Sequence, residues 1–169
     1  MGCDIHMYIE KYSTEDYYGP KDKREERGKK LETILDDNTY EPRWIPADKW
    51  DIDFDNEWTV HYHDRIFSGR NYSLFSILAD VRNHSDGINP ISEPRGVPDD
   101  ASFAYKQVVK AWGSDGHSHT YFTLQELLDV DWSQWSDDHG TIGFQQALEN
   151  VKSIDDDYSK VRLVFFFDN

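Results

Sequence analysis

The stretch VRLVFFF, residues 161–167, decides the fold, because six of its seven positions are apolar. A strand that is apolar on both faces belongs in the interior of a sheet, where both faces are covered. Residues 3–12, CDIHMYIEKY, predict a second strand. In it Ile5, Met7 and Ile9 alternate with polar residues, which is the period of a half-buried strand. We therefore expect one sheet that contains both the first and the last strand of the chain.

Helical periodicity occupies much of the chain between these two strands. Helices are expected over residues 73–83, 100–112, 124–130 and 144–151. Asp99 or Asp100 is the expected N-cap of the second helix. Thr123 caps the third, and Glu126 three residues later completes a capping box. The expected fold class is mixed α/β of the α+β type, with a single sheet packed by three or four helices.

The 169 residues fit a single domain, 1–169, without an internal repeat or a linker. Residues 44–62, rich in aromatic and β-branched side chains, predict one or two further strands. Residues 17–30 are charged and poor in apolar residues, so we expect a charged surface excursion there, with a short helix after it over residues 31–35. Residues 85–100 form a Gly/Pro-rich loop, and loops of that length are often functional.

The net charge of −15, from 33 acidic and 18 basic side chains, argues against ordinary binding to a nucleic-acid backbone. The single cysteine, Cys3, excludes an intramolecular disulfide and is expected to be a small core residue. No apolar run approaches the roughly eighteen residues of a membrane span, and the first residues lack the pattern of a signal peptide. We expect a cytoplasmic protein that contacts neither nucleic acid nor membrane; assembly into a homo-oligomer is left open.

Four of the seven histidines form two His-x-His pairs, His61/His63 and His117/His119. On a strand the residues i and i+2 face the same side, so each pair can present two imidazoles to one point. Asp4 and His6 share a face of the first strand in the same way. If a strand that carries His117 and His119 lies beside the first strand, Asp4, His6, His117 and His119 converge as ligands of a divalent transition metal, Zn or Mn. The alternative is that they are surface or hydrogen-bonded histidines.

A second candidate site precedes the helix expected over residues 73–83. Arg70, Asn71 and Tyr72 combine an arginine fork with a helix N-terminus, after a glycine turn, and this suits a phosphate or another anion. Arg95, in the long loop, is a weaker candidate ligand-binding residue. For each arginine the alternative is an ion pair with one of the many acidic side chains.

The blocks MGCDIH, GRNYSLFSILADVRN, PISEPRGVPDD and DGHSHTYFTLQELL occur in this order. Together they resemble a family of small hypothetical proteins encoded by bacteriophages and prophages, over most of the chain apart from residues 17–30. The resemblance implies a protein made in the cytoplasm of an infected bacterial host cell, and it brings no established activity. The blocks contain the histidine and arginine positions named above.

Three functions from different classes follow. In the first, the protein binds a small phosphorylated, nucleotide-like molecule at its histidines and Arg70, and hydrolyses it with the help of a metal. The catalytic groups of such a phosphodiesterase-like enzyme would be His117, His119 and Asp115. In the second, the same groups sequester a host immune nucleotide signal without catalysis. In the third, an acidic decoy or nucleic-acid mimic binds a basic host protein.

Overall fold

The computed structural model describes residues 2–15, 41–52, 58–84 and 87–169. Their centre is a four-stranded antiparallel sheet with the strand order β2-β1-β6-β5. The strands are β1 (Ile5–Ser13), β2 (Arg43–Pro46), β5 (His117–Thr123) and β6 (Val161–Phe167). The first and last strands lie in the interior of the sheet and pair over their length, with Ile5 opposite Phe167 and Lys11 opposite Val161. This confirms the sheet that was expected from residues 3–12 and 161–167.

Four α-helices accompany the sheet in the described ranges: α3 (Tyr72–Ala79), α4 (Phe103–Trp112), α5 (Leu124–Leu128) and α6 (Thr141–Val151). The α+β class is therefore confirmed. Two more short strands, β3 (Trp50–Ile52) and β4 (Trp58–Val60), pair with each other in a separate ladder. The charged excursion and the short helix expected over residues 17–35 lie outside the described residues.

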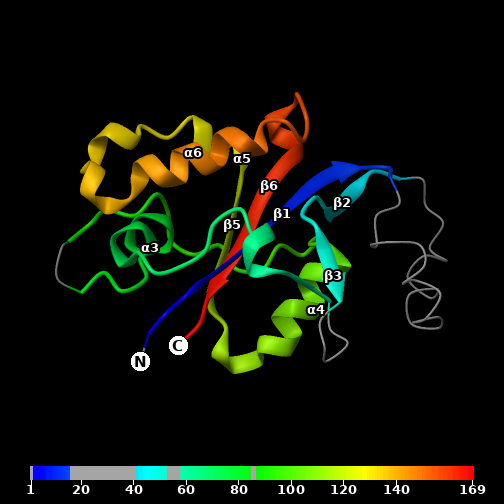
Figure 1. The fold of residues 1–169 in the computed structure, drawn as a ribbon, viewed down its shortest axis with the longest axis horizontal. Coiled ribbons are helices and arrows are strands. Elements are labelled where there is room, and N and C mark those ends of the chain that lie inside the picture. The colour runs from blue at the N-terminus through cyan, green and yellow to red at the C-terminus, as the bar shows by residue number, and fades with distance from the viewer. Residues whose placement is uncertain (1, 16–40, 53–57, 85–86) are drawn as a thin grey trace.

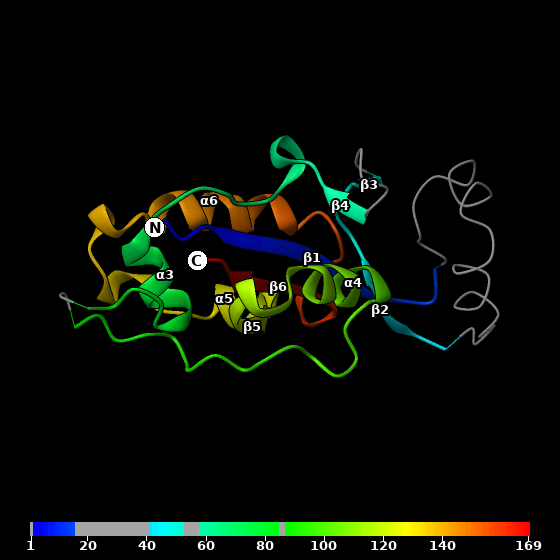
Figure 2. The ribbon, with the colours of Figure 1, turned by 90° about the horizontal axis from the view of Figure 1, so that it is seen from below.

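Different layers cover the two faces of the sheet. On one face Ile5, Met7 and Phe165 pack with buried residues of α3, α5 and α6. On the other face Tyr8 and Phe166 pack with α4 and with the β3–β4 ladder. Figures 1 and 2 show α6 on one side of β1 and α4 on the opposite side in both views. The same figures show the two termini side by side at one end of the sheet.

Several helix boundaries differ from those expected. Helix α3 ends at Ala79 instead of residue 83, because Asp80 adopts a left-handed conformation with φ 56°. Helix α4 begins at Phe103, and its N-cap is Ser102, whose side chain accepts a hydrogen bond from the Tyr105 N–H. The prediction of Asp99 or Asp100 as the N-cap was therefore wrong. α5 ends at residue 128 rather than 130, and α6 begins at residue 141 rather than 144. The capping box at the start of α5 is confirmed.

The polar face of β1 is buried under α4. Glu10 is 1 % exposed and accepts hydrogen bonds from Nε of Arg162 at 2.7 Å and from the Ser102 N–H at 2.7 Å. Arg162 also donates to Asp100 at 2.8 Å, and its guanidinium lies 4.0 Å from the ring centroid of Trp44. A buried ion pair of this kind needs such additional partners to offset its desolvation.

The long loop after α3 covers the free edge of β5. The Gly96 N–H donates to the His119 carbonyl at 2.8 Å, and the Arg95 N–H donates to Oγ1 of Thr120 at 3.2 Å. These bonds satisfy backbone and side-chain groups at an edge that would otherwise be open to pairing. None of the helices in the described part of the chain is long and apolar enough to span a bilayer.

Candidate functional site

The candidate site lies where β1 and β6 meet at the end of the sheet that holds both termini. The Asp4 N–H donates to Oδ1 of Asp168 at 2.7 Å, and the Asp168 N–H donates to the Asp4 carbonyl at 3.1 Å. His6 follows on β1 and is paired with Phe166 on β6. The antiparallel register therefore sets one acidic side chain from each end of the chain beside a single buried histidine.

His6 is held by one carboxylate and two aromatic rings. Its Nε2 lies 3.1 Å from Oδ2 of Asp168. Its ring centroid is 4.4 Å from that of Trp112 and 4.9 Å from that of Phe166, with which it stacks. Burial lowers the pKa of His6, against a smaller rise from the Asp168 hydrogen bond, and the charge of Arg65 lowers the pKa further. The ring is therefore favoured in its neutral form, and the other nitrogen, Nδ1, is buried without a hydrogen-bond partner among the described residues.

A bulge in β5 separates the two histidines that strand parity was expected to align. Ser118, between them, has a φ of 51°, and the register between β5 and β6 shifts across residues 117–120. His117 is paired with Phe167, and its Nε2 lies 3.2 Å from the carbonyl oxygen of Asp168. His119 turns its ring to Phe166, with 5.1 Å between centroids. The bulge breaks the period of two on which the expected alignment of His117 and His119 rested, and their rings contact different residues of β6, Phe167 and Phe166.

The site does bring His6 and His119 to the same aromatic ring. Their centroids are 4.9 Å and 5.1 Å from that of Phe166, so the two imidazoles are at most about 10 Å apart, the sum of these distances. Burial lowers the pKa of His119 as well, opposed by the backbone of Gly116 and reinforced by His117. Two imidazoles favoured in the neutral state thus flank Phe166, on strands that lie either side of β6.

No set of three or more His, Cys, Asp or Glu side chains in the described ranges is arranged to hold a metal ion. Asp4 is paired with Arg70. Nε2 of His6 faces a carboxylate oxygen of Asp168, and Nε2 of His117 faces the backbone carbonyl oxygen of the same residue. Binding of Zn or Mn by Asp4, His6, His117 and His119 therefore stays a prediction.

Arg70 pairs with Asp4 through two hydrogen bonds, from Nε at 2.7 Å and from Nη2 at 3.1 Å. The hydrogen bond from Arg70 lowers the pKa of the Asp4 carboxyl. The guanidinium also lies against Gly2, where a Cβ atom would come within 2.2 Å of it. Arg70 is thus at the predicted site, but it is committed to an ion pair, which was the alternative considered for it.

The other predicted ligand-binding and catalytic residues have local roles. Asn71 is the N-cap of α3 and accepts the Leu74 N–H at 3.0 Å, and Tyr72 begins that helix with an exposed side chain. Arg95 pairs with Glu126 at 2.9 Å on the outer side of β5 and α5. Asp115 is exposed in the 3-10 helix Gly113–Asp115 and is not hydrogen-bonded to either neighbouring histidine.

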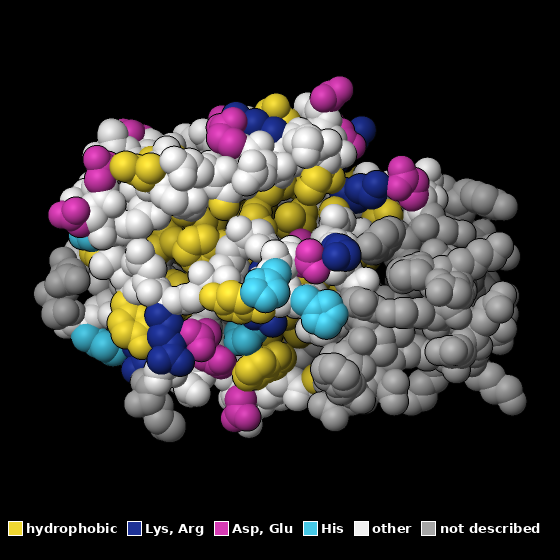
Figure 3. All heavy atoms as spheres, viewed as in Figure 1, with side chains coloured by type: hydrophobic (Ala, Val, Ile, Leu, Met, Phe, Trp, Pro, Cys, Tyr) yellow, Lys and Arg dark blue, Asp and Glu magenta, His cyan; other side chains and the backbone are white. Residues whose placement is uncertain are grey.

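His61 and His63 also depart from expectation. They are not on a strand: His61 precedes the 3-10 helix Tyr62–Asp64, which contains His63, and both side chains are exposed. Figure 1 shows this short helix in front of β1 and β6. In Figure 3 histidine, basic and acidic side chains lie next to apolar ones in the lower middle of the same face.

Arg65 and Arg82 were not singled out from the sequence, and both lie at this end of the sheet. Nε of Arg65 donates to the Val60 carbonyl at 3.1 Å, and the charge of Arg65 lowers the pKa of both His6 and Asp4. Arg82 contacts Cys3 and lies 5.9 Å from the ring centroid of Tyr72. Among the described residues neither guanidinium is paired with a carboxylate. In a chain with 33 acidic side chains, an arginine that has no carboxylate partner among the described residues and whose charge acts on a buried histidine is unexpected.

Asp168, Phe166 and Trp112 are the other site residues that sequence reasoning missed. A signal for Asp168 was present, since a polar residue directly follows the apolar strand that pairs with the His6 strand. Trp112 had no comparable signal, because nothing in the sequence indicates that α4 covers this face.

No protein-family model, no curated protein and no solved structure matches this chain. The resemblance to phage and prophage proteins therefore stays a prediction, and the function has to be inferred from the residues of the site itself.

Proposed function

We propose that this protein binds a small phosphorylated, nucleotide-like molecule at the cluster formed by His6, His119, Arg65 and Trp112. The observation that carries the proposal is Arg65, whose guanidinium is without a carboxylate partner in the described structure although its charge reaches both His6 and Asp4. A guanidinium without a carboxylate partner can still donate strong hydrogen bonds to phosphate oxygens, here through the nitrogens that do not contact the Val60 carbonyl. The neighbouring imidazoles and the half-buried Trp112 supply the polar and aromatic contacts that a nucleoside needs.

The charge of the chain sharpens this proposal. A net charge of −15 repels anions in general, so a phosphorylated ligand needs a local concentration of basic groups. Arg65, Arg70 and Arg82 lie near Asp4 and Cys3, close to the N-terminus. Arg70 is largely neutralised by Asp4, which leaves Arg65 and Arg82 as the groups that can meet a phosphate.

Isothermal titration calorimetry with the four common nucleoside 5′-monophosphates tests the proposal. We expect at least one of them to bind, and the Arg65→Gln variant to bind it about tenfold more weakly or worse, because a charge-assisted contact is lost. Lys49→Gln is the matched control, since Lys49 is an exposed cation near the same short 3-10 helix and pairs with Asp64 at 3.3 Å. The absence of binding by all four nucleotides, or equal losses in both variants, would contradict the proposal.

Sequestration and hydrolysis use the same contacts and are separated by the fate of the ligand. Recovery of the bound nucleotide unchanged after incubation indicates sequestration. Addition of water to a cyclic nucleotide to give the nucleoside monophosphate indicates a phosphodiesterase, and release of nucleoside and phosphate from the monophosphate indicates a phosphomonoesterase. Repeating the incubation with added Zn²⁺ or Mn²⁺ tests the predicted assistance by a metal. An acidic decoy would instead bind a basic protein, and its affinity for that protein would not change in Arg65→Gln.

A further inference from the structure

His6 has one nitrogen that no residue in the described part of the chain contacts through a hydrogen bond. A carboxylate only accepts hydrogen bonds, so the contact of Nε2 with Asp168 fixes the proton of the neutral ring on Nε2. Nδ1 is then an acceptor, and it is buried without a donor in the ranges that the structure describes. Buried polar atoms in proteins are nearly always paired, and an exception calls for an explanation such as a missing partner.

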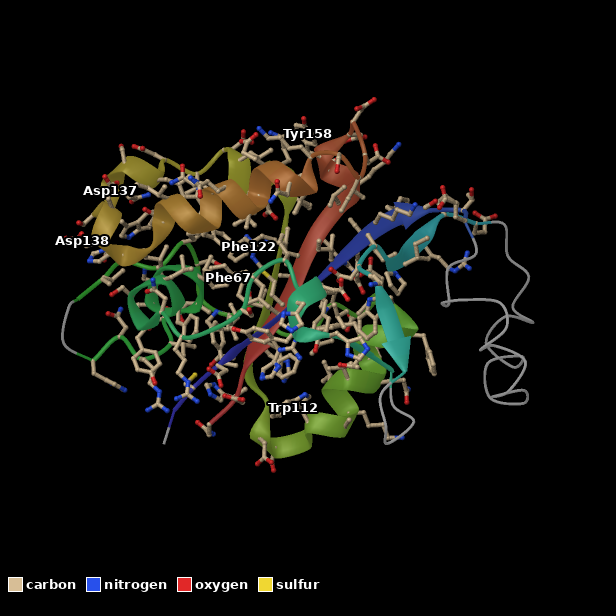
Figure 4. All side chains as sticks on the ribbon, viewed as in Figure 1. Phe67, Trp112, Phe122, Asp137, Asp138 and Tyr158 are labelled. Atoms are coloured by element: carbon tan, nitrogen blue, oxygen red, sulfur yellow. The ribbon has the colours of Figure 1, made fainter. Side chains whose placement is uncertain are left out.

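The two rings that enclose His6 differ in how firmly they are held. Phe166 is fully buried near the C-terminal end of β6, with strands on both sides. Trp112 is the last residue of α4, is half-buried, and is followed by Gly113 with a φ of 53°. Figure 4 shows Trp112 on the α4 side of the strands, near the end of the sheet. Of the two walls, Trp112 is therefore the one that can move away from His6.

We propose that Trp112 is the movable wall of a nucleobase-binding subsite, in which the base stacks on Trp112 and donates an N–H to Nδ1 of His6. This inference rests on the proposed function and names the part of the ligand that this end of the site recognises. Stacking on tryptophan accepts any base, whereas the unused acceptor on His6 selects a ligand with a hydrogen-bond donor on its planar edge.

Two sets of residues contact two different parts of the ligand. Arg65 meets the phosphate, and Trp112 with His6 meets the base. His6 is only 6 % exposed, so the base reaches Nδ1 after Trp112 has turned outward. Asp168 acts as a positioning residue, since it keeps the proton on Nε2 and the lone pair on Nδ1.

Comparison of the tightest-binding nucleoside 5′-monophosphate with ribose 5-phosphate tests the inference. We expect the nucleotide to bind the unmodified protein at least about tenfold more tightly, and this preference to disappear in Trp112→Ala. Arg65→Gln should weaken both ligands by a similar factor. Equal affinity of nucleotide and ribose 5-phosphate for the unmodified protein would overturn the inference and leave the proposed function standing, whereas binding of neither would overturn both.

Tryptophan fluorescence supplies a second readout that does not depend on the alanine variant folding. The chain has six tryptophans. In Trp112→Phe a ring remains for stacking, so we expect binding to persist while the change in fluorescence on adding nucleotide is lost. Trp135→Phe is the matched control, because Trp135 donates to the Asn89 carbonyl on the opposite side of the sheet. A fluorescence change that survives in Trp112→Phe and disappears in Trp135→Phe would also overturn the inference.

Discussion

Nε2 of His6 lies 3.1 Å from Oδ2 of Asp168, and this contact joins the first strand of the sheet to the residue directly after the last one. The other oxygen of the same carboxylate accepts the Asp4 N–H at 2.7 Å. One side chain near the C-terminus thus fixes the backbone and the imidazole of the first strand together. The site and the pairing of the first strand with the last one depend on the same residue.

Asp168→Ala should lower the free energy of unfolding by about 1–3 kcal/mol, because it leaves the Asp4 N–H and Nε2 of His6 without their acceptor. Urea titration followed by circular dichroism measures this loss. Asp115→Ala removes an exposed carboxylate, and we expect a change within about 0.5 kcal/mol for it. Equal stabilities of the two variants would show that the contact between His6 and Asp168 contributes little.

The pair formed by Glu10 and Arg162 predicts a different pattern. Both side chains are at least nine-tenths buried, so Glu10→Ala leaves the charge of Arg162 with the exposed Asp100 as its one carboxylate partner among the described residues. We expect a loss of about 3–5 kcal/mol in the free energy of unfolding.

The double substitution Glu10→Met, Arg162→Met removes both charges and keeps the volume apolar, so it should be closer to the unmodified protein than Glu10→Ala is. Thermal and urea unfolding of the three proteins side by side checks this order. A double variant that is less stable than Glu10→Ala would mean that the ion pair itself is the stabilising element.

The sheet could be predicted from sequence because its two interior strands carry strong local signals. The apolar run 161–167 and the alternation in residues 3–12 each indicate a strand, and burial on both sides follows from the first pattern. Helix ends were less predictable, since they depend on single residues. Asp80 ends α3 by adopting φ 56°, a conformation that nothing in the sequence around it requires.

Only part of the site could be predicted, because strand parity says nothing about bulges or about which distant segments pack against a strand. Parity placed His6 on the polar face of the first strand, and His6 does share the buried face beneath α4 with Tyr8 and Glu10. Parity failed at His117 and His119, because Ser118 introduces a bulge. Trp112 and Arg65 come from segments distant in the chain, and only the packing of α4 and of the segment after β4 brings them to His6.

Asp48 predicts how stability depends on pH. Burial raises the pKa of this carboxyl to about 8, helped by the charge of Glu10 and opposed by the hydrogen bond from the Ile9 N–H. The folded state therefore retains a proton that the unfolded chain releases above its ordinary pKa of 3.8. The contribution of Asp48 to stability is full at low pH and falls as the pH rises toward 8, by at most about 1.4 kcal/mol per pH unit.

Asp48→Asn removes this titration and keeps an oxygen that can accept the Ile9 N–H. We expect the variant to gain stability relative to the unmodified protein as the pH rises from about 5 to about 8. Urea titrations at several pH values give the difference directly. Asp64→Asn, at an exposed aspartate of the 3-10 helix Tyr62–Asp64, controls for the loss of one negative charge. A difference that is constant with pH, or that matches the control, would contradict the raised pKa.

Two glycines three residues apart, at the start of α6, should respond to alanine in opposite directions. Gly143 lies within the helix, is exposed, and a Cβ there meets nothing within 4 Å. Alanine at this position should stabilise the protein by about 0.4–1 kcal/mol, because it restricts the unfolded chain and favours the helix. Gly140 precedes the helix with a φ of 77°, and a Cβ there would come within 2.0 Å of Nδ2 of Asn71.

Gly140→Ala should therefore cost more than Gly143→Ala gains, because it combines backbone strain with a clash. The clash falls on the side chain that caps α3, so relief by rotation of Asn71 would sacrifice the hydrogen bond to the Leu74 N–H. Loss of an N-cap costs about 1 kcal/mol, and we expect Gly140→Ala to lower the free energy of unfolding by at least that much. Urea titration of the two variants measures both signs in one experiment. If Gly140→Ala were neutral, the contact of residues 140 and 71, which fixes the start of α6 against the start of α3, would have to be looser than the structure shows.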